Sequence, residues 1–325
     1  MRSKEANAIH FAFGVDANYV KYAGVLMTNL VHQHIGKQLC FHLAMDGLSK
    51  EDEERLNNFT ALYRGTEIYG YQADDIISQL NLPSENVPPR LNRSVLLRVL
   101  LPQFLPRQLK RVIYMDVDML ARGSMESLWK LDLKGCPLAA LPERTENGNA
   151  DRLSLSSGKY FNAGIMVIDL ELWRRRKLTE KVTACYQQNT SNFLMMEQDA
   201  LNTVLDGDFL PLDIRYNRQL EANNPAAAKW EPEDVVLHFV NEAKPWTKGC
   251  LQEFYDMYWQ YVKLSLWQDI EPLEPTTVKA GYLAGKNAEA RGDYKEAAHY
   301  LGITAARLME YYLYESEPKN KNQVK

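Results

Sequence analysis

The feature that most constrains the fold is a regular alternation of short apolar runs with longer amphipathic segments. Residues 9–16 (IHFAFGVD) and 39–46 (LCFHLAMD) are strand-like runs, and residues 19–34 between them repeat apolar side chains at helical spacing. Ser49 is a suitable N-cap for a second helix, which precedes a third strand-like run at residues 66–72. Strands that alternate with helices pair in parallel and carry helices on both faces, so the sequence predicts an α/β fold.

The same alternation continues to about residue 240. Further strands are predicted at residues 111–120, 137–142, 161–170 and 234–240. Further helices are predicted at residues 92–101, from residue 171 and at residues 197–205, and Pro102 is expected to stop the first of these. Residues 143–158 are polar, aperiodic and rich in Gly and Ser, so a long loop is expected there.

The length of the chain and a change in its sequence pattern after about residue 265 predict two domains. The 325 residues suit one large α/β domain with a small appendage. Residues 267–277 carry two prolines, and beyond them two amphipathic helices meet at residues 291–293 in a hairpin that resembles a single tetratrico-type repeat. We therefore expect a main domain at residues 1–262 and a linker with a helical hairpin and tail at residues 263–325.

Charge and composition exclude several classes of protein. The net charge of −4 gives no indication of a nucleic-acid binder. No apolar run approaches the ~20 residues that span a bilayer, and the first residues lack the apolar core of a signal peptide. The four cysteines lie far apart without a CxxC pair, which disfavours a zinc site and favours reduced thiols. We therefore expect a cytoplasmic protein.

Polar residues gather where the predicted strands end or begin. In an open α/β sheet, ligands bind outside the carboxyl ends of the strands. Asp16 closes the first strand and is followed by Asn18 and Tyr19, whereas Asn162 opens the run at residues 161–170. The remaining polar residues at such positions are Asp116, Asp118 and His238. Several strand ends that supply polar groups to one rim indicate a single site.

The chemistry of that rim suggests a divalent cation. Asp116 and Asp118 repel each other when both are ionised, unless a cation lies between them. Two carboxylates and the imidazole of His238 favour manganese over calcium. Lys244, six residues after His238, would help such a metal to hold a diphosphate, as in a sugar nucleotide. A DxD is short and common, however, and two solvated carboxylates at an exposed strand end remain an alternative on this pattern alone.

Five segments together resemble a known family. FGVDANY, YMDVDML, FNAGIMVIDL with Trp173, EQDALN and HFVNEAKPW occur in the order and spacing of family-8 glycosyltransferases. More narrowly, the chain resembles the bacterial lipopolysaccharide core α-glucosyl- and galactosyltransferases over about residues 8–312. The resemblance implies a GT-A type, Rossmann-like nucleotide-sugar-binding domain with a mixed, mostly parallel sheet and a short C-terminal helical extension.

The resemblance also implies a role for each matching residue. The uridine of a UDP-sugar would be contacted by Gly14, Val15, Asp16, Ala17, Asn18 and Tyr19. Mn²⁺ or Mg²⁺ would be held by Asp116, Asp118 and His238, with Val117 along the ribose. The diphosphate would be covered by Asn241, Lys244 and Trp246, and the sugar would be contacted by Arg98 and Asn162. Gln198 would lie beneath the anomeric carbon, where it would stabilise positive charge on the sugar ring.

The resemblance thus implies a retaining enzyme that transfers glucose or galactose from UDP-glucose or UDP-galactose to the lipopolysaccharide core. Such an enzyme would work on the cytoplasmic face of the inner membrane, with peripheral contact at most. Glu143 and Glu197 stand where several members carry aspartate, and Asn241 where some carry glycine, which leaves the donor sugar open. The alternatives are a protein or storage-glycan acceptor and, in another class, a non-catalytic interaction protein that uses the helical hairpin.

Three residues also have simpler interpretations. Tyr19 could be an aromatic side chain packed on the core at a helix start. Arg98 could be a surface arginine on a helix, and Gln198 could be an amide on a helix surface.

Overall fold

The computed structural model describes residues 8–72, 96–189 and 191–315. The chain divides into two compact units that interleave in sequence. The first unit consists of the described residues of Met1–Arg218, Glu231–His238 and Leu264–Gln268. The second unit consists of the described residues of Gln219–Trp230, Phe239–Lys263 and Asp269–Lys325. The domain boundary expected between residues 262 and 263 stays a prediction.

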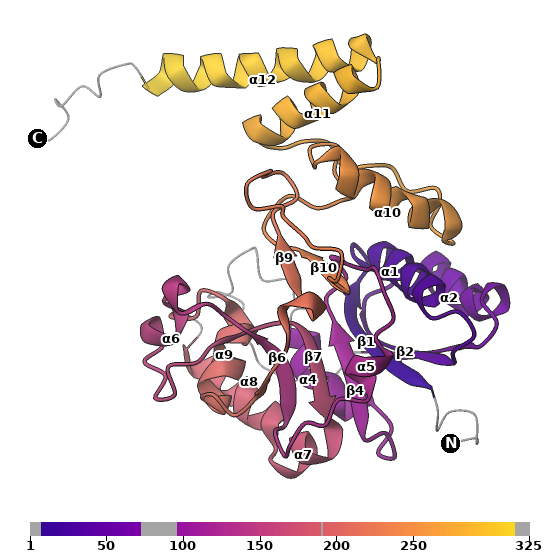
Figure 1. The fold of residues 1–325 in the computed structure, drawn as a ribbon, viewed down its shortest axis with the longest axis vertical. Coiled ribbons are helices and arrows are strands. Elements are labelled where there is room, and N and C mark those ends of the chain that lie inside the picture. Colours follow the sequence, from indigo (N-terminus) through magenta and orange to yellow (C-terminus); the bar gives the residue numbers. More distant parts are fainter. Residues whose placement is uncertain (1–7, 73–95, 190, 316–325) are drawn as a thin grey trace, which may run out of the picture. The chain divides into compact units, whose positions relative to one another are not determined.

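A seven-stranded sheet in the order β3-β2-β1-β4-β7-β6-β8 forms the centre of the first unit (Figure 1). Its strands are β1 (Ile9–Asp16), β2 (Leu39–Asp46), β3 (Thr66–Gln72), β4 (Arg111–Met115), β6 (Leu138–Pro142), β7 (Phe161–Asp169) and β8 (Leu210–Pro211). β3, β2, β1 and β4 pair in parallel, as do β6 and β8, whereas β7 runs antiparallel to both β4 and β6. The expected mixed, mostly parallel α/β sheet is therefore confirmed.

Alternate side chains of the central strands pack on opposite faces of this sheet. Phe11 and Phe41 pair across β1 and β2 on one face, where Phe41 meets Phe59 of helix α2 (Lys50–Leu62) edge-on, with ring centres 5.9 Å apart. Ala12 belongs instead to the hydrophobic cluster on the other face. Because helices cover both faces, β1 and β2 are buried almost throughout.

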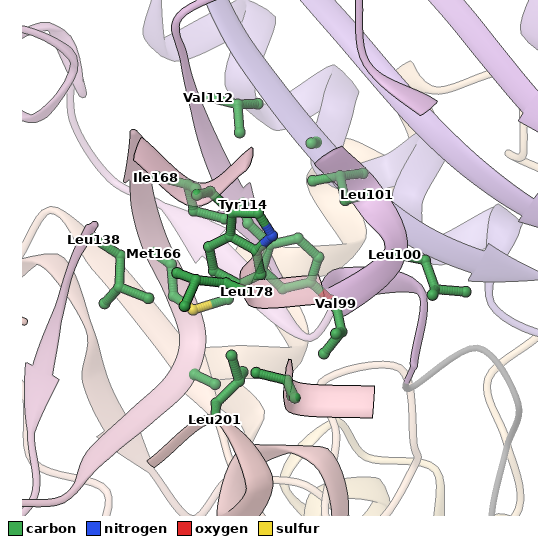
Figure 2. Close-up of a cluster of buried hydrophobic side chains, with 14 of the residues drawn as sticks. Val99, Leu100, Leu101, Val112, Tyr114, Leu138, Met166, Ile168, Leu178 and Leu201 are labelled. Atoms are coloured by element: carbon green, nitrogen blue, oxygen red, sulfur yellow. The ribbon is translucent and has the colours of Figure 1, made fainter. Parts of the chain in front are cut away.

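Two groups of helices provide this cover in the first unit. α1 (Val20–Gln33) and α2 (Lys50–Leu62) lie on the face of Phe41, and Ser49 caps α2 by accepting the N–H of Asp52 at 3.1 Å, as predicted. The other face carries α4 (Leu97–Phe104), α7 (Leu170–Arg175), α8 (Leu178–Asn189) and α9 (Met196–Leu205). Figure 2 shows hydrophobic side chains between the sheet and these helices, among them Val99, Tyr114, Met166, Leu178 and Leu201, gathered in one cluster.

Several sequence-based boundaries need correction. The run at residues 111–120 is two strands, because β4 ends at Met115 and β5 (Met119–Ala121) pairs antiparallel with β10 (Val236–Phe239). Pro102 does not stop α4, which continues to Phe104; a proline near a helix end removes only one backbone hydrogen bond. The predicted start of that helix, at residue 92, lies outside the described residues.

The predicted loop at residues 143–158 contains two short helical turns. These are η3 (Thr145–Asn147) and α6 (Asn149–Arg152). The other short elements are α5 (Glu126–Trp129), η4 (Ile214–Tyr216) and β9 (Arg218–Leu220).

The second unit is mainly helical. α10 (Gln252–Leu264), α11 (Val278–Ala290) and α12 (Tyr294–Glu315) are its helices, and α11 and α12 form the predicted hairpin. Glycines at the interface of this hairpin allow close approach: a Cβ on Gly281 would meet Thr304 Oγ1 at 2.5 Å, and one on Gly285 would meet Leu301 at 2.7 Å. Among the described residues, no helix is long and apolar enough to cross a membrane.

Candidate active site

The turn after β1 is held by the side chain of Asp16. Its Oδ1 accepts the backbone N–H groups of Asn18 at 2.8 Å and Tyr19 at 3.0 Å, which fixes residues 16–19 in a tight turn before α1. Gly14 and Val15 lie on β1, and Ala17 is exposed in the turn. Tyr19 is 39 % exposed, so it is not a buried core residue. Partial burial and the negative charges of Asp118 and Asp16 raise the pKa of Tyr19, because each disfavours a phenolate there.

Asp116 follows β4 directly and is anchored on three sides. Its backbone N–H donates to the carbonyl of Gly164 at 2.7 Å. Its Oδ1 accepts from Arg98 Nη2 at 3.0 Å and from the Tyr114 hydroxyl at 2.9 Å. Burial raises the pKa of Asp116, and the Arg98 guanidinium opposes that rise.

Arg98 is a buried bridge between two carboxylates, which rules out its interpretation as a surface residue. It is 7 % exposed, its guanidinium lies 5.2 Å from the Tyr114 ring centre, and Nη1 donates to the Ala163 carbonyl at 3.1 Å. Its Nε lies 3.1 Å from Glu197 Oε1, although the N–H is poorly directed, so this contact is an ion pair rather than a good hydrogen bond. Burial raises the pKa of Glu197 to about 7 despite the opposing Arg98 charge.

Asp116, Asp118 and His238 converge on one point, as the sequence predicts. One ligand atom from each lies within 4.8 Å of the other two, and His238 Nε2 is 3.4 Å from Asp118 Oδ1. Val117, between the two aspartates, is buried. Two carboxylate oxygens and one imidazole nitrogen fit a hard or borderline divalent cation such as Mn²⁺ or Mg²⁺.

The antiparallel direction of β7 brings Asn162 and Gln198 to the same edge of the sheet. β7 begins where β4 ends, with Ile165 opposite Met115. Gln198 Oε1 accepts the backbone N–H of Ala163 at 2.8 Å and lies 3.4 Å from Asn162 Nδ2, while its Nε2 donates to the Tyr160 hydroxyl at 3.0 Å. Gln198 is therefore tied to β7 rather than placed on a free helix surface.

The polar residues around Gln198 include three that carry no signal in the sequence, namely Tyr160, Arg152 and Asn149. The Tyr160 hydroxyl donates to Asp199 Oδ1 at 2.7 Å. Arg152 binds both oxygens of Asp199, at 2.8 and 3.0 Å, and also donates to Asn149, which in turn contacts Glu143. The predicted loop is thus joined to α9 through charge-assisted hydrogen bonds, which are stronger than neutral ones.

Three further predicted residues belong to the second unit and are described within it. Asn241 has a φ of +64°, which is unfavourable for most residues but easy for glycine and explains why a glycine suits this position. Lys244 Nζ donates to the Phe239 carbonyl at 2.5 Å. Trp246 is 3 % exposed, with its ring centre 5.6 Å from that of Tyr258. Their contacts with a donor remain predictions.

Comparisons with known proteins define the class and then the family. The fold is that of the GT-A glycosyltransferases: the galactosyltransferase LgtC, solved with donor and acceptor sugar analogs, superimposes with a TM-score of 0.63 over 77 % of this chain and 95 % of LgtC, at 22 % identity. The model of glycosyl transferase family 8 matches residues 10–250. The chain belongs to glycosyl transferase family 8.

Curated relatives cover most of the chain at about one quarter identity. General stress protein A of Bacillus subtilis is 26 % identical over 277 residues, which span 81 % of this chain and 96 % of that protein. Lipopolysaccharide 1,2-glucosyltransferase of Escherichia coli K12 is 25 % identical over 84 % of this chain and 83 % of its own. Lipopolysaccharide 1,3-galactosyltransferase of Salmonella typhimurium is 25 % identical over 94 % of this chain and 93 % of its own. The chain is thus related to lipopolysaccharide glucosyl- and galactosyltransferases.

Proposed function

We propose that the protein is a retaining transferase that moves glucose or galactose from a UDP-sugar to the lipopolysaccharide core, with Mn²⁺ or Mg²⁺ as cofactor. The observation that carries this proposal is the convergence of Asp116, Asp118 and His238 beside Asn162 and Gln198. The family and the two lipopolysaccharide hexosyltransferases among its relatives support the choice of substrate class.

The proposed donor site joins the turn after β1 to this rim. Gly14, Val15, Asp16, Ala17, Asn18 and Tyr19 would bind the uridine, and Val117 the ribose. Asn241, Lys244 and Trp246 would close over the diphosphate. When bound, the divalent ion stabilises negative charge on the departing diphosphate.

The protein's own residues orient the sugar and the reacting groups. Arg98 holds Asp116 in place through the contact at 3.0 Å and would reach the sugar together with Asn162. The Gln198 amide is locked by Ala163 and Tyr160, so its oxygen has a fixed direction. A fixed amide dipole can stabilise positive charge that develops on the sugar ring, with no reorganisation during the reaction.

An amide oxygen is a poor nucleophile compared with the carboxylates that form covalent intermediates. We therefore favour attack on the same face as the leaving group. The bond from the anomeric carbon to the diphosphate oxygen breaks, a bond to the acceptor oxygen forms, and the acceptor proton passes to the departing diphosphate oxygen. The anomeric configuration is retained.

We place the protein at the cytoplasmic face of the inner membrane, because its proposed acceptor is an amphiphile. Met309, Tyr311, Tyr312 and Leu313 near the end of α12 are each 56 to 69 % exposed, which supports peripheral contact with a lipid surface.

A panel of donors and acceptors tests the proposed reaction. UDP-glucose, UDP-galactose and their N-acetyl forms are incubated with Mn²⁺ and truncated lipopolysaccharide cores, and the product linkage is read by NMR. We expect one of the two plain hexoses to be transferred with an α linkage. A β-linked product would contradict the retaining mechanism, and transfer of only N-acetyl sugars would contradict the donor class.

Sugar transfer to a protein or a storage glycan, in place of the lipopolysaccharide core, is the second candidate function. The same panel therefore includes a protein and a glycogen-type glycan as acceptors. Transfer to either of these, without transfer to the truncated cores, would favour this alternative over the lipopolysaccharide core.

A further inference from the structure

A chain of three amide contacts connects His238 to the start of β7. His238 Nδ1 lies 2.9 Å from Asn217 Oδ1, and Asn217 Nδ2 donates to Asn162 Oδ1 at 2.9 Å. The backbone N–H of Gly164 donates to the same Asn162 oxygen at 3.0 Å. Asn217 is fully buried in the bend between η4 and β9. The metal-ligand candidate and the sugar-binding candidate therefore share one buried partner.

The backbone of Gly164 fixes the direction of every bond in this chain. A backbone N–H can only donate, so the Asn162 atom that it meets must be the amide oxygen. That oxygen can only accept, and so the Asn217 atom facing it must be the NH₂ group. The other Asn217 atom is then the oxygen, which requires a hydrogen on the His238 nitrogen that faces it.

The tautomer of His238 follows from this order. With the hydrogen on Nδ1, a neutral imidazole carries its lone pair on Nε2. Nε2 is the nitrogen that faces Asp118, at 3.4 Å from Oδ1. The chain of amides thus presents the electron pair of His238 to the point where Asp116 and Asp118 converge, as a metal ligand requires.

The imidazole ring of His238 fits in its position only because Gly164 has no side chain. A Cβ on Gly164 would lie 2.4 Å from His238 Cε1 and 2.9 Å from Asn162 Oδ1. Gly164 therefore supplies both the N–H that orders the amides and the space that the imidazole occupies.

We propose that Asn217 is a positioning residue that sets the tautomer and orientation of His238 for metal binding and, through Asn162, the orientation of the sugar-binding amides. This inference rests on the proposed function, because it assumes that Asp116, Asp118 and His238 bind Mn²⁺ or Mg²⁺. Asn217 would thus affect the binding of both the metal and the donor without contacting either.

Two substitutions separate this role from simple packing. Asn217→Leu keeps the size of the side chain but removes both hydrogen bonds. Asn217→Asp keeps an oxygen for His238 Nδ1 but replaces the donor to Asn162 by a second acceptor oxygen. Asn189→Leu is the matched control, since Asn189 is a partly buried asparagine whose Nδ2 donates to the Cys185 carbonyl in α8.

The main readout is the affinity of the full chain for Mn²⁺, which is measured by electron paramagnetic resonance without any nucleotide. We expect Asn217→Leu to weaken Mn²⁺ binding about 10- to 100-fold, the range usual for lost second-layer partners of a metal ligand. Asn217→Asp should stay within about threefold of wild type, because its carboxylate still accepts from His238. In a transfer assay at saturating Mn²⁺, however, Asn217→Asp should lower kcat about tenfold, because Asn162 loses its donor.

The outcomes distinguish this inference from the proposed function. Wild-type affinity in Asn217→Leu, or an equal loss in Asn217→Asp, would overturn the positioning role while the proposed function stands. Failure of the wild type to bind Mn²⁺ would overturn both. Should Asn217→Leu not fold, as judged by circular dichroism, Asn217→Ala removes the same two hydrogen bonds without adding an apolar branch and is held to the same expectation.

Discussion

Replacing Asp118 by alanine is expected to lower kcat/KM for sugar transfer by about a thousandfold or more. A divalent ion contributes several kcal/mol of charge stabilisation to such reactions, and each 1.4 kcal/mol is about a factor of ten in rate. Asp118 has one of the three ligand atoms that lie within 4.8 Å of one another, so its loss leaves two ligands, Asp116 and His238. Initial rates of UDP release in the presence of acceptor measure this effect.

Asp132→Ala is the control for this substitution. Asp132 is exposed and its Oδ1 accepts the backbone N–H of Lys134, outside the ligand group. We expect its activity to stay within about twofold of wild type, as for most surface substitutions. An Asp118→Ala protein that retained full metal-dependent transfer would be incompatible with the proposed site.

Replacing Arg98 by leucine should destabilise the protein by about 3–5 kcal/mol, because it leaves buried carboxylates without their counter-charge. Arg98 lies 3.0 Å from Asp116 and 3.1 Å from Glu197, and its side chain is 9 % exposed. Urea denaturation at pH 8 measures the loss. Arg175→Leu, at an exposed position of α7, is the control and should change stability by less than about 0.5 kcal/mol.

The loss in Arg98→Leu should depend on pH. The pKa of Glu197 is raised from 4.5 to about 7 in the folded protein, and removal of the Arg98 charge raises it further. A carboxyl group whose folded pKa is raised gives its full stability at pH values below the unfolded pKa and loses it as the pH rises through the folded pKa. The variant should therefore be closer to wild type at pH 5 than at pH 8. The same loss at both pH values would mean that Glu197 does not carry the effect.

The sequence predicted the elements that have a local signal. β1, β2 and β3 have the predicted bounds. β1 and β2 are apolar runs that end in aspartate, and β3 is rich in the aromatic and β-branched side chains that favour strands. The grouping of Asp116, Asp118 and His238 was also predictable, since strand ends meet at one edge of a sheet. By contrast, the split of residues 111–120 depends on β10, which lies more than a hundred residues away in sequence and pairs with β5.

The second layer of the site could not be predicted in the same way. Asn217 lies in a bend, Tyr160 directly before β7 and Arg152 in a short helix, and none has a periodic pattern around it. Their partners His238, Asn162 and Asp199 are 21 to 55 residues distant in sequence, so these contacts emerge only when the chain is folded. Arg174 is a similar case: we find it half-buried, and its guanidinium donates to the carbonyls of Pro102, Leu105, Pro106, Arg107 and Leu109.

The central claim is that Asp116, Asp118 and His238 hold a divalent ion that binds the diphosphate of a UDP-sugar. Isothermal titration of UDP into the EDTA-treated protein, with and without added Mn²⁺, tests it most directly. The account predicts that UDP binding is at least about tenfold weaker without the ion, since a metal–phosphate contact is worth more than about 1.4 kcal/mol. Equal UDP affinity with and without Mn²⁺ would contradict it.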